Sequence, residues 1–101
     1  MTQPDLFDET LDQQFEKWVH SPEGGMAANW FIRLGLQAKK AGLEKYGAKG
    51  IAEVLRWQIS IEKKSGEIFK INNNYISRLA RFAEERAPEL KGLFEKRELK
   101  T

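Results

Sequence analysis

Apolar residues recur at steps of three and four along most of this chain, which is the spacing of amphipathic helices. The segments with this spacing are about 11–19, 26–41, 48–61 and 74–86. A further short helix is expected after Pro88, because proline favours the first helical position. The pattern therefore predicts a mainly α fold, a compact single domain of four to five short helices over residues 10–97.

Several of the predicted helices carry recognisable start and stop signals. Thr10 followed by Gln13 has the form of a capping box. Ser21 and Pro22 are typical of a helix start, although Gly24-Gly25 weakens that first turn and leaves a start near Met26 open. Gly42 is placed to end the same helix.

The later segments define the remaining faces and connections. In the third helix, the pattern places one group of residues on one side, namely Ile51, Val54, Leu55, Gln58 and Ile59, with Trp57 and Ile61 near its edge. Residues 67–71 alternate only partly between apolar and polar, which fits a short strand or an extended connector. The glycine-bearing turn inside residues 26–61 favours a helix-turn-helix, and a winged-helix domain is the weaker alternative because one extended segment makes no hairpin.

Composition adds few restrictions. The 101 residues suffice for one domain, and a 41% hydrophobic share supports a folded core. The absence of cysteine excludes disulfides and thiolate metal sites. No apolar run is long enough for a bilayer and the first residues are acidic, so we expect a cytoplasmic protein without a membrane partner. Residues 1–9 are expected to be a flexible acidic segment, and residues 98–101 a frayed end.

The net charge of +2 conceals a strong division along the chain. Residues 1–25 hold six acidic residues against one lysine, a balance of −5. Residues 33–81 hold eleven basic residues against four glutamates, a balance of +7. This division indicates either a surface that attracts phosphates or two oppositely charged faces that partly neutralise each other within the fold.

Candidate catalytic patterns are weak. His20 is the only histidine, and it stands beside a helix-start signal, where a capping or solvated role is expected. Glu62 and Lys64 have the Glu-x-Lys spacing of many metal nucleases, but Glu98 and Lys100 repeat it by chance near the C-terminus. We therefore expect no enzyme, no metal, no cofactor and no small-molecule substrate.

The basic middle of the chain predicts a nucleic-acid interface, with DNA as the expected partner. Lysines and arginines neutralise phosphates, and asparagines beside a helix start bond the backbone or base edges. The candidate residues are Lys39, Lys40, Lys45, Lys49, Lys70, Asn72, Asn73, Asn74, Arg78 and Arg81. The structural alternative is that the asparagines are caps and that the arginine pair, three residues apart on one face, is solvated or paired with glutamates.

A protein-binding module that modulates a host or phage enzyme is the alternative function. Its interface would be the acidic first helix together with surface tryptophans, with Trp18 and Trp57 as candidates. Nucleic-acid binding weakens steeply with salt, whereas a mostly apolar protein interface does not. This difference separates the two hypotheses.

The run Lys70-Ile71-Asn72-Asn73-Asn74-Tyr75, followed by Leu79-Ala80-Arg81 and Pro88-Glu89-Leu90, resembles a group of small uncharacterised proteins encoded by phages and prophages. Ile51 through Arg56-Trp57 and Phe94 through Arg97 are similar to the same group, and the likeness extends over about residues 15–97. Members often have histidine where this chain has Ala87, and two phenylalanines where it has Leu93-Phe94. The resemblance implies a phage setting, a host-cytoplasmic location and a helical fold, and it adds no catalytic residue.

Overall fold

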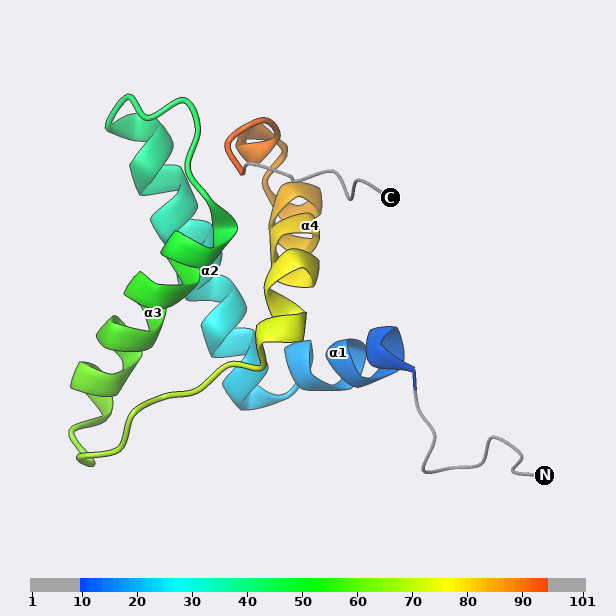
Figure 1. Cartoon of the computed structure of the whole chain (residues 1–101), viewed down its shortest axis with the longest axis vertical. Coiled ribbons are helices and arrows are strands. Elements are labelled where there is room, and N and C mark those ends of the chain that lie inside the picture. The colour runs from blue at the N-terminus through cyan, green and yellow to red at the C-terminus, as the bar shows by residue number, and fades with distance from the viewer. Residues whose placement is uncertain (1–9, 95–101) are drawn as a thin grey trace.

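A computed structural model describes residues 10–94, and the expectations for residues 1–9 and 98–101 lie outside this range. Its elements are α1 (Leu11–Val19), α2 (Pro22–Lys40), α3 (Ala48–Lys63), η1 (Asn73–Tyr75), α4 (Ile76–Arg86) and η2 (Pro88–Leu90), where η denotes a 3-10 helix. Figure 1 shows α3 at one edge of the molecule, while α1 extends from the start of α2. The predicted mainly α fold is confirmed.

The first two helices begin where their capping residues predict. Thr10 Oγ1 accepts a hydrogen bond from the Gln13 amide at 3.1 Å, and Gln13 Oε1 accepts one from the Thr10 amide at 3.0 Å. Ser21 Oγ accepts from the Gly24 amide at 3.1 Å, so α2 begins at Pro22 rather than near Met26. The first amides of a helix have no hydrogen-bond partner within it, and the Ser21 hydroxyl supplies one for the Gly24 amide. This bond offsets the weak helix propensity of Gly24 and Gly25.

Gly24 has a steric role at the corner between α1 and α2. A Cβ atom at this position would lie 1.7 Å from the Trp18 carbonyl oxygen, far inside contact distance. The Ser21 hydroxyl donates to the same carbonyl at 2.6 Å. The end of α1 therefore approaches α2 as closely as a residue without a side chain allows.

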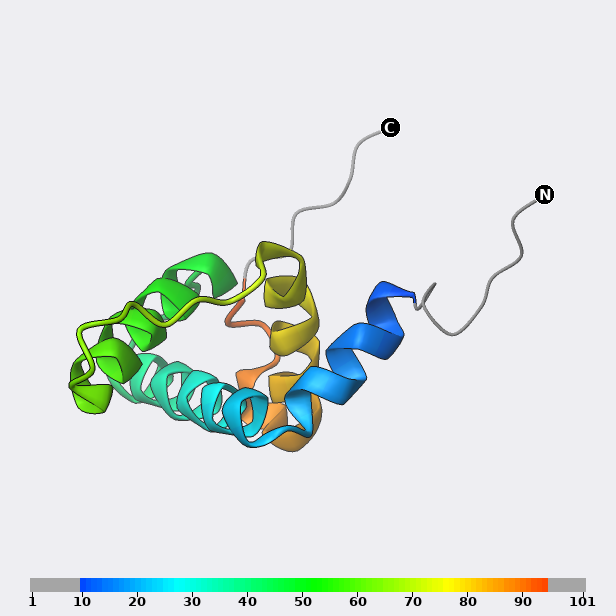
Figure 2. The ribbon, with the colours of Figure 1, turned by 90° about the horizontal axis from the view of Figure 1, so that it is seen from below.

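The α2 C-terminus ends in a Schellman motif. The Leu43 amide donates to the Ala38 carbonyl at 3.0 Å, and the Gly42 amide donates to the Lys39 carbonyl at 3.0 Å. Gly42 has φ +97, which glycine adopts without strain, so its predicted role as a helix stop is confirmed. Residues 41–47 then lead to α3, which lies beside α2 (Figure 2). This connection is longer than the three- to four-residue turn of a typical helix-turn-helix, and that interpretation stays a prediction.

The segment between α3 and η1 is an extended connector, residues 64–72, and residues 10–94 contain no strand and hence no hairpin wing. Phe69 and Ile71 are buried in it, while Ile68 between them is exposed. The Phe69 amide donates to Ser60 Oγ at 2.8 Å. Two buried side chains and one bond to α3 thus hold the connector without strand pairing.

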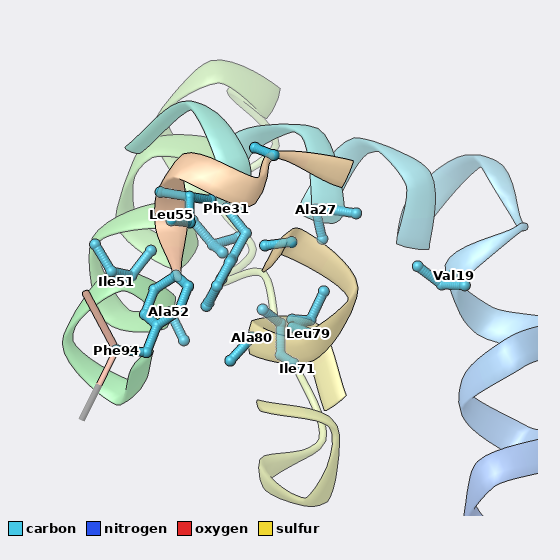
Figure 3. Packing of buried hydrophobic residues seen from close by; sticks show 14 of the residues in the cluster. Val19, Ala27, Phe31, Ile51, Ala52, Leu55, Ile71, Leu79, Ala80 and Phe94 are labelled. Atoms are coloured by element: carbon cyan, nitrogen blue, oxygen red, sulfur yellow. The ribbon is translucent and has the colours of Figure 1, made fainter. Parts of the chain in front are cut away.

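The core forms where α2, α3 and α4 meet (Figure 3). Phe31, Leu55 and Leu79, one from each helix, have no exposed surface. Leu90 of η2 is equally buried and packs on Gly35, whose added Cβ would lie 3.0 Å from Leu90 Cδ2. The interior thus draws on every helix of the bundle and on the segment after α4.

Aromatic rings attach α1 to the start of α4. The Phe15 ring lies 5.6 Å from that of Tyr75 and 6.3 Å from that of Phe82, measured between centroids. The Trp18 ring lies 5.1 Å from that of Tyr75. The apolar face of α1 is therefore covered by η1 and α4.

Candidate nucleic-acid interface

The ten candidate residues fall into two groups. Lys39, Lys40, Lys45 and Lys49 surround the connection from α2 to α3, whereas Lys70, Asn72, Asn73, Asn74, Arg78 and Arg81 belong to the connector, η1 and α4. In Figure 1 the first group lies at the upper end of the molecule, and the second begins near its middle, where α4 starts beside α1. The structure does not bring the ten residues to a single surface.

The first group lies close to a segment from much later in the chain. The Tyr46 amide donates to the Leu93 carbonyl at 2.8 Å. The Lys39 ammonium donates to the Glu89 carbonyl at 2.5 Å, across fifty residues of sequence. The first contact joins the connection after α2 to the turn after η2, and the second joins the last turn of α2 to η2.

This contact adds Lys91, which the sequence did not predict as a site residue. Lys39 and Lys91 both line a shallow open pocket of about 410 Å³, together with Glu44 and Leu93. We use the name "basic end" for the exposed lysines gathered here: Lys39, Lys40, Lys45, Lys49 and Lys91. Among residues 10–94, this end holds five lysines and two glutamates, Glu44 and Glu89, which gives a net positive charge.

In the second group, Asn72 is a structural cap. Its Oδ1 atom accepts from the Asn74 amide at 2.9 Å, and its carbonyl accepts from the Tyr75 amide at 2.9 Å. The side chains of Asn73 and Asn74 are exposed. One of the three asparagines is therefore a cap, but it caps η1, which leads into α4, whereas the N-cap of α4 itself is Tyr75 and makes no side-chain cap bond.

Arg78 does not project freely into solvent. Its Nε donates to Asp12 Oδ1 at 2.6 Å, and its Nη1 donates to the Asn74 carbonyl at 3.1 Å. Its side chain is only 24% exposed, against 77% for Asp12. The side chain of Arg78 is therefore partly buried and paired with an anionic group from α1, and its contact with phosphate stays a prediction.

The surroundings of Arg81 are also acidic. Arg78 and Arg81 share a face, as expected, and line one groove between α1 and α4. Three carboxylates line the same groove, from Asp12, Glu16 and Glu85. A phosphate approaching this face would meet these carboxylates, so the groove is poorly suited to nucleic acid.

The third helix exposes apolar side chains on the side away from the core. Trp57 is 63% exposed, Val54 41% and Ile61 48%, and Ile68 of the connector is 68% exposed. We call these four residues the outer patch. Val54, which the spacing places on one side of α3 with Ile51 and Leu55, is exposed whereas those two are buried, so it lies at the edge of the side that α2 and α4 cover.

Of the two tryptophans considered for an interface, Trp18 packs against other aromatic residues and Trp57 is exposed. Trp18 is half-buried against Phe15 and Tyr75, so it contributes to the aromatic contact of α1. Trp57 is the exposed one, and its helical spacing does not place it in the core. The acidic first helix therefore has no free apolar face, whereas α3 has one.

Comparisons with protein-family models, with curated proteins and with solved structures find no match to this chain. The resemblance to phage and prophage proteins stays a prediction. Among residues 10–94, no helix is long and apolar enough to cross a membrane. The arrangement of charges and apolar side chains therefore carries the functional argument.

Proposed function

We propose that this chain is a non-enzymatic nucleic-acid-binding protein that contacts phosphates through the basic end. The observation that carries the proposal is the approach of η2 and the turn after it to the end of α2 and the connection that follows, which adds Lys91 to four lysines already close in sequence. Clustered lysines on one end of a small domain are the electrostatic footprint of phosphate binding. Both contacts that join the segments involve backbone carbonyls, so the clustering does not consume carboxylates.

The basic end differs from the second group in how its charges are used. Lys40, Lys45, Lys49 and Lys91 are exposed, and Lys39 donates to a neutral carbonyl. In the second group, the guanidinium of Arg78 is already paired with Asp12. Within the part of the chain that the structure describes, phosphate contacts at the basic end therefore do not have to displace an ion pair, and we assign the interface to this end alone.

The test is duplex-DNA binding followed by fluorescence anisotropy across a range of salt concentrations. Logarithmic affinity is expected to fall linearly with logarithmic salt concentration, by about 0.9 per phosphate neutralised. The double variant Lys45→Ala/Lys49→Ala should reduce this slope by roughly 1.8. The matched control Lys70→Ala/Arg81→Ala removes the same charge from the second group and should leave the slope unchanged.

Two outcomes contradict the proposal. The first is an absence of DNA binding by the unaltered protein even at low salt. The second is an equal loss of slope in both double variants, which would return the interface to the whole basic middle of the chain. Circular dichroism of each variant checks that the helices are retained.

A protein-binding module is the second candidate function, and the outer patch favours it. A tryptophan that is 63% exposed among aliphatic side chains is typical of an interaction surface. Binding through this patch would persist at high salt and depend on Trp57 rather than on the lysines. The patch and the basic end share no residue, so variants of each test the two functions separately.

A further inference from the structure

The outer patch lies along one side of α3. Val54, Trp57 and Ile61 follow each other at steps of three and four, which is the spacing of a seam between two packed helices. Ile68 is exposed on the connector, and the next residue, Phe69, donates its amide to Ser60 of α3 at 2.8 Å. Among residues 10–94, Val54, Trp57 and Ile61 remain exposed on α3, a helix at the edge of the bundle (Figure 1).

The order of residues in the seam suits pairing with itself. Val54 lies three residues before Trp57, and Ile61 lies four residues after it. A two-fold axis near Trp57 would place Val54 of one copy beside Ile61 of the other, with the two Trp57 rings next to each other. At each end of the seam, a β-branched side chain of one copy would thus pack against a β-branched side chain of similar size from the other copy.

The charges beside the seam favour an antiparallel arrangement. Glu53 stands near the start of the seam, and Lys64, the C-cap of α3, follows the end of the helix. Antiparallel pairing brings Glu53 of each copy beside Lys64 of the other, whereas parallel pairing would oppose like charges.

We propose that the chain forms a homodimer through antiparallel packing of α3 on α3 of a second copy. The occupant of the outer patch is then an identical patch, with Trp57 at its centre as the residue that contributes most to binding. The small net charge of +2 opposes the approach of two copies only weakly. The proposal goes beyond nucleic-acid binding and does not depend on it.

Sedimentation velocity of the full chain, from micromolar to millimolar concentration, tests the dimer. Trp57→Glu should raise the dissociation constant on the order of 100-fold, since a central tryptophan is lost from both copies. Ile61→Glu should also raise it, whereas the matched control Leu43→Glu should not, because Leu43 is 44% exposed but lies outside the patch. A chain that stays monomeric throughout, or a dimer insensitive to Trp57→Glu, overturns the proposal.

A charge exchange tests the antiparallel geometry without disturbing the apolar seam. Glu53→Lys alone and Lys64→Glu alone should each weaken the dimer roughly three- to tenfold, and the double variant should restore it. Additive weakening in the double variant overturns the pairing. A monomeric chain that binds a different, identified protein through Trp57 would make the outer patch a hetero-interface and would likewise overturn self-pairing.

Discussion

Arg78 Nε lies 2.6 Å from Asp12 Oδ1, which joins α4 to α1 across sixty-six residues of sequence. This ion pair is one direct contact between the acidic front and the basic middle of the chain. It shows that part of the charge division is used within the fold. The same guanidinium also donates to the Asn74 carbonyl, so it ties α1 to the start of α4.

The ion pair should contribute little to stability, because Asp12 is 77% exposed. A double-mutant cycle with Asp12→Ala and Arg78→Ala should give a coupling of about 0.2–1 kcal/mol in urea unfolding, falling with added salt. Arg78→Ala should cost more than Asp12→Ala, since it also removes the bond to Asn74. A coupling that does not respond to salt would contradict an exposed pair.

Asn72 should be the one asparagine of its run with a measurable stability role. Its side-chain bond to the Asn74 amide predicts a loss of about 0.5–2 kcal/mol for Asn72→Ala. Asn73→Ala is the control and should stay within about 0.5 kcal/mol, as for ordinary surface positions. Equal denaturant midpoints for the two variants would reject the cap.

Gly24 and Gly25 provide a matched pair for the α1–α2 corner. Gly24→Ala should destabilise the protein by roughly 2–4 kcal/mol or displace α1, because its Cβ would overlap the Trp18 carbonyl. Gly25→Ala should be neutral or stabilising by up to about 1 kcal/mol, since its Cβ would meet Val19 O at an ordinary 3.6 Å. Urea unfolding followed by tryptophan fluorescence measures both, and similar effects at the two positions would exclude a steric corner.

Ser60 should anchor the connector through its hydroxyl. It accepts from the Phe69 amide at 2.8 Å and donates to the Arg56 carbonyl at 2.6 Å. Ser60→Ala leaves the Phe69 amide without this partner and should cost about 1–3 kcal/mol. Ser60→Thr keeps the hydroxyl and should lose much less, and faster hydrogen exchange of the Phe69 amide in Ser60→Ala alone would identify the bond.

The helix boundaries were predictable because their signals are local. Thr10 with Gln13, Ser21 and Gly42 each act on backbone groups within a few residues, so spacing alone identifies them. The start of α2 was left open because glycine propensity competes with the cap, and the close approach to Trp18 that requires Gly24 is a tertiary contact.

The side on which α3 faces the core was less predictable. Apolar residues cover most of its circumference, so periodicity alone does not tell Val54 from Ile51. Packing by α2 and α4 buries Ile51 and leaves Val54 exposed. A helix with two apolar sides needs its neighbours to decide which side becomes the interior.

The candidate interface was predictable only where its residues are close in sequence. Four lysines between 39 and 49 stayed together for that reason, whereas Lys91 joins them through contacts across about fifty residues. The ion pair of Arg78 could not be predicted, because its partner, Asp12, is equally remote in sequence. Charge counting along a chain cannot register such long-range pairing.

The central position of α2 has a consequence for the order of folding. It contacts α1, α3 and α4, and the first two are its neighbours in sequence, whereas α4 reaches it only after the connector has closed. Nearby contacts lose less chain entropy, so we expect α2 and α3 to associate in the transition state and α4 to dock later. Leu55→Ala should therefore slow refolding in stopped-flow experiments, while the equally buried Leu79→Ala should mainly accelerate unfolding. The opposite pattern would mean that α4 docks before the α2–α3 pair forms.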